Sequence, residues 1–199
     1  MTKRIAEVKR KTKETDIMVK LNLDGKGEYK VSTPNGFFTH MLELFSRHSL
    51  IDLTLKAKGD VEVDLHHTIE DVGICLGQAL SKTLGEKKRI VRFGHSLLPM
   101  DRTLVEISLD LSGRPALVFN VQFKKSMRGG FDFELVEEFF WGLVNSAGIT
   151  LHINLKYGKN NHHISEAIFK GFGVALRQAI KIEPRIKEIL STKGTPILK

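Results

Sequence analysis

Disulfide bonds and membrane spans are both missing from this sequence. Its only cysteine, Cys75, has no disulfide partner and sits among apolar residues, so we expect a reducing compartment and a core position for it. No apolar run approaches the roughly 20 residues that a membrane-spanning helix needs. The basic start, 1–13, also lacks the apolar centre of a signal peptide. These absences favour a cytoplasmic protein.

Linker-like stretches are scarce as well. The five prolines are scattered and no segment is rich in proline, serine or glutamine, so we expect a single domain over 1–199. The content of 41% hydrophobic and 27% charged residues argues against a disordered chain. The formal charge of +8 fits either a nucleic acid or an anionic small substrate, and it does not choose between them.

What the sequence does contain is an internal repeat. The segment 64–71, DLHHTIED, is echoed 96 positions later by 160–167, NNHHISEA. Both copies continue as apolar helical segments, 72–84 and 168–180. A repeated unit indicates residues that share a task, so we expect two pseudo-symmetric halves of approximately 1–90 and 91–199.

Apolar periodicity predicts the same order of elements in each half. Spacings of three and four predict helices over 37–48 and 133–146, in addition to the two motif helices. Alternating apolar residues predict strands between them. Each half is thus expected to run strand, strand, helix, strand, strand, helix, an α+β pattern with helices covering a sheet face. The expected strands are 17–23, 29–33, 50–56, 61–64, 91–97, 104–111, 116–123 and 149–156.

The repeated motif has the residue types and the spacing of a metal site. On a helix, Glu70 lies beside His67 and His66, three and four positions away, and Glu166 stands likewise to its own pair. Because adjacent helical residues point about 100° apart, a His-His pair offers one ligand to each of two ions. Imidazole with carboxylate suits manganese, iron or zinc better than calcium or magnesium. The sequence therefore predicts a two-metal site and leaves the metal open.

Two further ligands follow from the repeat. His40 and Glu138 fall opposite one another when the 37–48 and 133–146 helices are aligned, and each is a competent ligand. His48, His95 and His152 have no such support, and we expect structural or substrate-proximal roles for them.

Several motifs in order resemble one enzyme family. They are 64–73, PMD at 99–101, LDLSGRP at 109–115, 148–153 and 160–172, and the similarity runs from about Arg10 to Lys193. Together they resemble imidazoleglycerol-phosphate dehydratase, a hydro-lyase of histidine biosynthesis. The resemblance implies a ribosomal protein S5 domain 2-like fold, in which a duplicated unit places helices between two four-stranded sheets. It also implies a homo-oligomer of 24 subunits, with active sites between subunits that hold two Mn(II) ions.

The resemblance assigns the ligands residue by residue. One ion is expected to take His66, Glu70, Glu138 and His162, and the other His40, His67, His163 and Glu166. The chain departs from the family twice. Glu138 stands where many members have histidine, which lowers the net charge of the site by one. Thr39 stands where many have aspartate, which puts the orientation of the neighbouring histidine in doubt.

The implied reaction removes water from D-erythro-imidazoleglycerol phosphate and gives imidazole acetol phosphate. Its carbon-bound proton is not acidified by a carbonyl, so the resemblance implies a metal-bound imidazolate that takes up the electrons. The expected catalytic residues are Glu14, Asp101 and Glu166. The expected substrate-binding residues are Glu14, Arg92, Arg114, Ser191 and Lys193, the last four as phosphate contacts.

Two other functions are compatible with parts of the sequence. A basic α+β nucleic-acid binder would explain the charge, but it would leave the paired histidines unexplained and no strand carries an aromatic stacking motif. A two-metal phosphate-ester hydrolase could use the same ligands to activate water. Release of phosphate from esters would distinguish it from the dehydratase.

Overall fold

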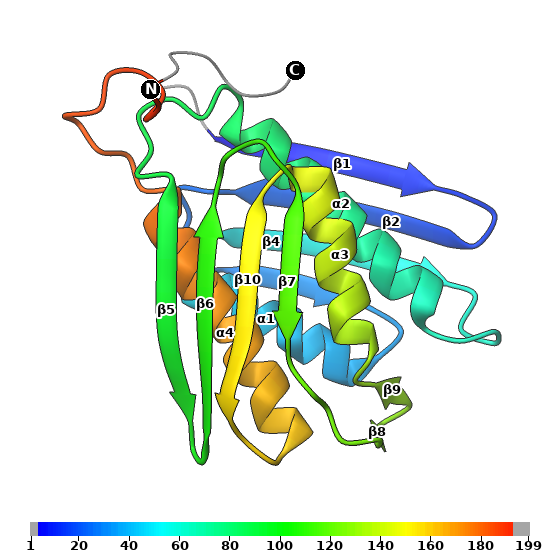
Figure 1. Cartoon of the computed structure of the whole chain (residues 1–199). Helices are drawn as coiled ribbons and strands as arrows, with labels where there is room; N and C mark the ends of the chain where they lie inside the picture. The colour runs from blue at the N-terminus through cyan, green and yellow to red at the C-terminus, as the bar shows by residue number, and fades with distance from the viewer. Residues whose placement is uncertain (1–3, 193–199) are drawn as a thin grey trace.

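The computed structural model describes residues 4–192, in which four helices lie between two four-stranded sheets (Figure 1). The α+β class and the sandwich of helices between sheets are confirmed. None of the helices in this part of the chain is both long and apolar enough to cross a membrane.

The two sheets have the same arrangement of strands. The first has the order β1 (Ile5–Lys11), β2 (Thr15–Asn22), β4 (Asp52–Gly59), β3 (Tyr29–Ser32). The second has the order β5 (Phe93–Met100), β6 (Thr103–Asp110), β10 (Thr150–Tyr157), β7 (Ala116–Asn120). In each sheet the fourth strand pairs parallel to the third and the other pairings are antiparallel. A short hairpin, β8 (Met127–Arg128) and β9 (Phe131–Asp132), follows the second sheet's β7.

The four helices pack in pairs that join the two halves of the chain. They are α1 (Gly36–Ser49), α2 (His66–Leu84), α3 (Leu135–Ala147) and α4 (Asn161–Ala179). Helices α1 and α2 cover the first sheet, and α3 and α4 cover the second. Between the layers, α1 packs against α4 and α2 packs against α3. Each helix pair therefore draws one member from each half.

The core forms because alternate residues of the central strands point at the helices. Ile17, Val19 and Leu21 of β2 are 0–1% exposed, and Leu151 and Ile153 of β10 are fully buried. The helices fill the space between the sheets with a cluster of rings whose centroids lie 5.0–5.6 Å apart, formed by Phe38, Phe45, Phe139, Phe140, Phe169 and Phe172.

One expected strand is wrong, and three observed strands, β1 and the short β8 and β9, were not expected. The expected strand 61–64 is a turn over 61–63 instead, in which Val61 and Val63 are 46% and 65% exposed and pair with no strand of the described chain. The first sheet is completed instead by β1 at the start of the chain. The first half thus runs strand, strand, strand, helix, strand, helix, and the second repeats this order around its extra hairpin. The division at about residue 90 into two halves of one domain stays a prediction.

Candidate active site

Each copy of the repeated motif begins a helix in a similar way. At the start of α4 the Asn160 side chain accepts hydrogen bonds from the backbone N–H groups of His162 and His163, at 3.0 and 3.4 Å. At the start of α2 the Asp64 carboxylate accepts from the backbone N–H of His66 at 2.7 Å. The polar residue two positions before each histidine pair therefore fixes the first turn on which that pair is carried.

Helices α1 and α4 bring three of the expected ligands together. The Nε2 atom of His162 lies 2.7 Å from the Oε1 atom of Glu166, and the Nε2 atom of His40 lies 3.7 Å from the same oxygen. One ligand atom from each of the three lies within 4.8 Å of the others, the only such group of three or more in the described part of the chain. Donors of these types at this spacing could hold a metal ion.

Glu166 is the buried member of this cluster, at 7% exposure. Burial opposes its ionisation, but hydrogen bonds from Lys170 at 2.6 Å and from His162 outweigh burial and lower the pKa of the carboxyl. The Lys170 side chain is itself only 16% exposed. Glu166 therefore remains an anion at neutral pH, as a metal ligand must.

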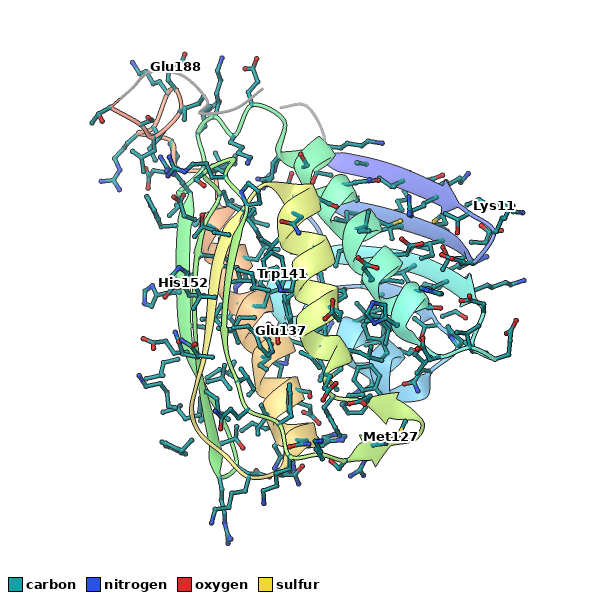
Figure 2. All side chains as sticks on the ribbon, turned by 45° about the vertical axis from the view of Figure 1, so that its right-hand side comes forward. Lys11, Met127, Glu137, Trp141, His152 and Glu188 are labelled. Atoms are coloured by element: carbon teal, nitrogen blue, oxygen red, sulfur yellow. The ribbon has the colours of Figure 1, made fainter. Side chains whose placement is uncertain are left out.

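A second group of expected ligands lies at the contact between α2 and α3. His66 and Glu138 line one hollow of about 580 Å³, and Glu70 and Glu138 line a neighbouring one of about 520 Å³. Within α2 the Nε2 atom of His66 is 4.0 Å from a Glu70 oxygen. Glu138 belongs to the same helix as Glu137 and Trp141, which are labelled in Figure 2.

The two remaining motif histidines each contact an aspartate. The Nδ1 atom of His67 lies 3.0 Å from Asp60, and this hydrogen bond raises the pKa of His67. The Nδ1 atom of His163 lies 3.5 Å from the carboxylate of Asp101, in the turn between β5 and β6. In both cases Nε2 is the ring nitrogen that remains for another partner.

Glu14 lies in the β1–β2 turn, close to the motif of α2. Its backbone carbonyl accepts from the N–H of Asp60 at 3.1 Å, and the charge of its exposed side chain contributes to the raised pKa of His67. Asp71 of α2 connects this helix to the two strands beside the turn. It is 6% exposed, and its carboxylate accepts hydrogen bonds from Arg10 at 2.8 Å and from the Thr15 hydroxyl at 2.5 Å. The expected acid/base residue is thus held near one of the expected ligands.

The expected phosphate contacts lie elsewhere in the single chain. The Arg92 guanidinium donates two hydrogen bonds to Asp110 and a third to the Leu190 carbonyl. The bonds to Asp110 raise the pKa of Arg92. This third bond holds the segment that contains Ser191, whereas Lys193 lies outside the described residues. Arg114 is exposed. Within residues 4–192, no hydrogen bond or ion pair joins either arginine to the histidine motifs.

The other singled-out residues also have defined places. Cys75 is fully buried and burial raises its thiol pKa to about 11, as expected for a core cysteine. His152 and His95 are exposed on the second sheet, where His152 is labelled in Figure 2. His48 is half-buried on α1, and burial, aided by the charge of Lys170, lowers its pKa.

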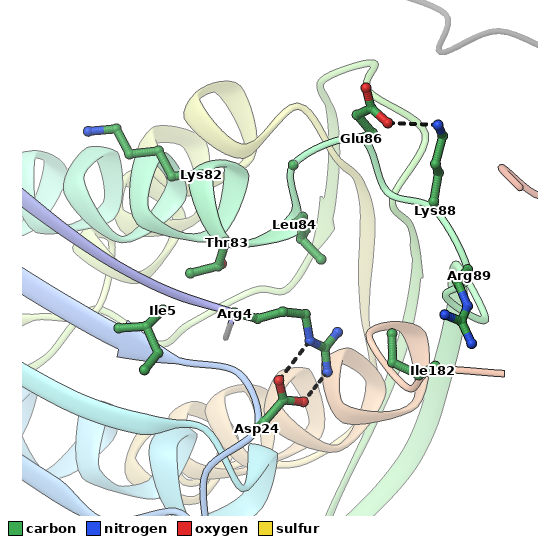
Figure 3. Close-up of a pocket in the computed structure, with 11 residues that line it drawn as sticks. Arg4, Ile5, Asp24, Lys82, Thr83, Leu84, Glu86, Lys88, Arg89 and Ile182 are labelled. Atoms are coloured by element: carbon green, nitrogen blue, oxygen red, sulfur yellow. Dashed lines mark hydrogen bonds and ion pairs between the residues drawn. The ribbon is translucent and has the colours of Figure 1, made fainter. Parts of the chain in front are cut away.

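A separate cavity of about 520 Å³ lies at the other end of α2 (Figure 3). Two of its basic residues are already paired, Arg4 with Asp24 and Lys88 with Glu86. No histidine lines it. The cavity therefore does not match the chemistry of the repeated motif.

Sequence reasoning missed three charged residues that hold the site. Lys170 could have been found, because it follows Glu166 by four positions, the spacing of a helical ion pair. Asp71 adjoins Glu70, but its partners Arg10 and Thr15 come from a strand pair that the sequence analysis only half identified. Asp60 contacts its histidine across a turn and has no periodic signal.

The donor set fits a transition-metal ion. Imidazole and carboxylate groups converge, and Nδ1 of His162 and Oδ1 of Asp60 are buried atoms that hydrogen-bond to nothing within residues 4–192. Buried polar atoms normally have a partner, so an unpaired atom on His162, in the ligand cluster, and another on Asp60, next to His67, indicate bonding capacity that the described chain does not use.

Comparisons with known sequences point to one family. A family model described as imidazoleglycerol-phosphate dehydratase matches residues 33–176. The imidazoleglycerol-phosphate dehydratase of Alkaliphilus metalliredigens is 56% identical over 186 residues, covering 94% of this chain and 95% of the relative. That of Acetivibrio thermocellus is 56% identical over 188 residues, covering 94% of this chain and 96% of the relative.

Solved structures agree with the sequence relatives. The crystal structure of imidazoleglycerol-phosphate dehydratase from Staphylococcus aureus has a TM-score of 0.82 and 41% identity, covering 90% of this chain and 99% of that one. The enzyme from Pyrococcus furiosus has a TM-score of 0.81 and 39% identity, covering 94% and 99%. The chain belongs to the imidazoleglycerol-phosphate dehydratase family of hydro-lyases.

Proposed function

We propose that this chain dehydrates D-erythro-imidazoleglycerol phosphate to imidazole acetol phosphate in histidine biosynthesis. The observation that carries the proposal is the convergence of His40, His162 and Glu166 from helices of opposite halves, in a chain of this family. We also propose a cytoplasmic location, on the ground of this biosynthetic role.

The proposed site holds two Mn(II) ions, and the donor types present are compatible with them. We assign His66, Glu70, Glu138 and His162 to one ion and His40, His67, His163 and Glu166 to the other. When bound, the ions supply Lewis acidity and a template for the imidazole ring of the substrate.

The chain's own residues have defined tasks in this proposal. Glu14, exposed and near His67, moves protons to and from the substrate. Asp101 holds the ring of His163 through Nδ1, and Glu166 stays ionised because Lys170 donates to it. Arg114, Arg92, Ser191 and Lys193 bind the phosphate, for which guanidinium groups have the matching geometry.

We propose that the active site lies between subunits of a 24-subunit homo-oligomer. Each proposed ion takes ligands from both helix pairs, yet the α1–α4 cluster is the only compact group of three or more candidate ligands in residues 4–192. A neighbouring copy that presents its α2–α3 face would complete the set. The exposed Val63 and Met127, which line the hollow beside His66 and Glu138, give that face apolar surface to bury.

The test is turnover of the substrate by metal-stripped protein, with and without added Mn(II). We expect the ketone product to appear only when about two ions per chain are bound, as this ligand set implies. Released inorganic phosphate, measured in the same samples, would support the hydrolase instead. Metal binding without either product would contradict both activities.

A further inference from the structure

Asp60 occupies the turn between β4 and α2, where it contacts two parts of the proposed site at once. Its carboxylate Oδ2 lies 3.0 Å from Nδ1 of His67. Its backbone N–H donates to the carbonyl of Glu14 at 3.1 Å. A residue outside the ligand set therefore joins the acid/base turn to a ligand-bearing helix.

The contact with His67 determines what that ring can bind. A carboxylate accepts hydrogen bonds, so Nδ1 of His67 must carry the proton in this contact. The neutral ring then has its lone pair on Nε2, which is the form that binds a cation, and the hydrogen bond fixes the ring's orientation.

Asp60 is itself held in place. Its side chain is 19% exposed, and the preceding Gly59 packs closely on α2, since a Cβ there would lie 1.9 Å from the Thr68 hydroxyl. Its second oxygen, Oδ1, is buried without a hydrogen-bond partner in the described residues. The side chain is therefore largely enclosed, and its one hydrogen bond within the described residues is the contact with His67.

We propose that Asp60 is a positioning residue, whose side chain holds His67 so that Nε2 is left to bind the metal. The inference deepens the proposed function and rests on it for the role of His67. Substituting an aspartate that hydrogen-bonds to a metal-bound histidine typically weakens metal binding by roughly 10- to 100-fold.

The test is the Mn(II) affinity of full-length Asp60→Asn, measured by calorimetry on metal-stripped protein. Asparagine has nearly the same shape and keeps the backbone bond to Glu14, so only the charged acceptor is lost. We expect binding weaker by roughly 10- to 100-fold, with a thermal midpoint of the metal-free protein close to that of the wild type. Asp16→Asn is the matched control, because Asp16 lies on the neighbouring strand β2 and, within the described residues, its side chain makes only an exposed ion pair with Lys11. Its affinity should not change.

A double-mutant cycle separates positioning from a general structural effect. If Asp60 acts through His67, then Asp60→Asn combined with His67→Ala should bind Mn(II) no more weakly than His67→Ala alone. Additive losses, or wild-type affinity in Asp60→Asn, would overturn the proposal. Asp60→Ser, which removes the same charge with a smaller side chain, should show the same loss if the asparagine variant does not fold.

The two proposals fail in different ways. If wild-type protein binds Mn(II) more tightly than Asp60→Asn but yields no ketone, the dehydratase activity is refuted and the positioning role is supported. Wild-type protein that binds no Mn(II) would refute the ligand assignment, and the role of Asp60 with it.

Discussion

Helices α2 and α3 approach each other closely at Gly73, and replacing this residue with alanine tests how the helix layer is built. A Cβ atom at this position would lie 2.3 Å from the carbonyl oxygen of Phe139, where ordinary van der Waals contact begins at 3.4 Å. The obstacle is backbone and cannot rotate away. The two helices must therefore separate by about 1 Å in a core that is otherwise closely packed.

The expected cost follows from two opposing effects. Alanine favours a helix interior by about 1 kcal/mol relative to glycine. Overpacking a core typically costs 1–3 kcal/mol and sometimes more, and a rigid obstacle places Gly73→Ala at or above the upper end of that range. We expect a net destabilisation of about 2 kcal/mol, which for a chain of this size lowers the melting temperature by roughly 4–8 °C.

The assay is thermal unfolding of metal-free protein at fixed concentration. Gly36→Ala is the matched control, because Gly36 begins α1 and a Cβ there would meet nothing within 4 Å. We expect that control to be neutral or to gain up to about 1 kcal/mol. If Gly73→Ala were as stable as the wild type, the close approach of α2 and α3 would not be a feature of the native protein.

Three further substitutions test other parts of the molecule. Burial raises the pKa of Asp52, but backbone hydrogen bonds from Lys26 and Glu28 outweigh burial and lower it. The stability that ionised Asp52 gives the folded protein is therefore complete above the ordinary pKa of 3.8 and is lost as the pH falls through the lower folded pKa. Asp52→Asn should thus lower the urea midpoint at pH 7 and converge with wild type in acid; a constant difference would contradict this. Glu14→Gln should keep Mn(II) binding and lower kcat by at least about 100-fold, the usual contribution of a general acid/base, and near-normal turnover would remove it from the mechanism. Arg114→Ala should raise KM about tenfold or more, for a lost charge-assisted phosphate contact, with little change in kcat; an unaltered KM would count against its phosphate role.

The parts of the fold that sequence could predict are those with strong apolar periodicity. Helices α1 and α3 were expected within two residues of their observed bounds at each end, because their buried faces recur every three or four positions. The duplicated motif also named candidate ligands before any geometry was known, and two of them, His162 and Glu166, lie together with His40. Repetition supplied the signal that a single His-His pair lacks.

The failures have physical reasons. In β1 only Val8 is buried, since the strand lies at a sheet edge and its other side chains are polar or partly exposed, so no apolar alternation marks it. Val61 and Val63 alternate like a strand, but both point outward from a turn. Pairing with a neighbour defines a strand, and the sequence of one segment does not contain that neighbour.

For the site, the repeat could name candidate ligands, but their grouping came from the family resemblance and not from the pattern of the residues. His40 joins Glu166 only because α1 packs on α4. Asp60 reaches His67 only because the chain turns sharply after β4. Both contacts depend on tertiary packing, which periodicity within one element does not encode.

Each helix of one half packs against a helix of the other half, α1 on α4 and α2 on α3, so neither half has a complete core of its own. A fragment ending before β5 would contain α1 and α2 without α4 and α3, and their inner apolar faces would be open to water. Two such fragments could bury these faces only by associating with each other. We expect cleavage between the halves to give pieces that are unstable alone and complement one another.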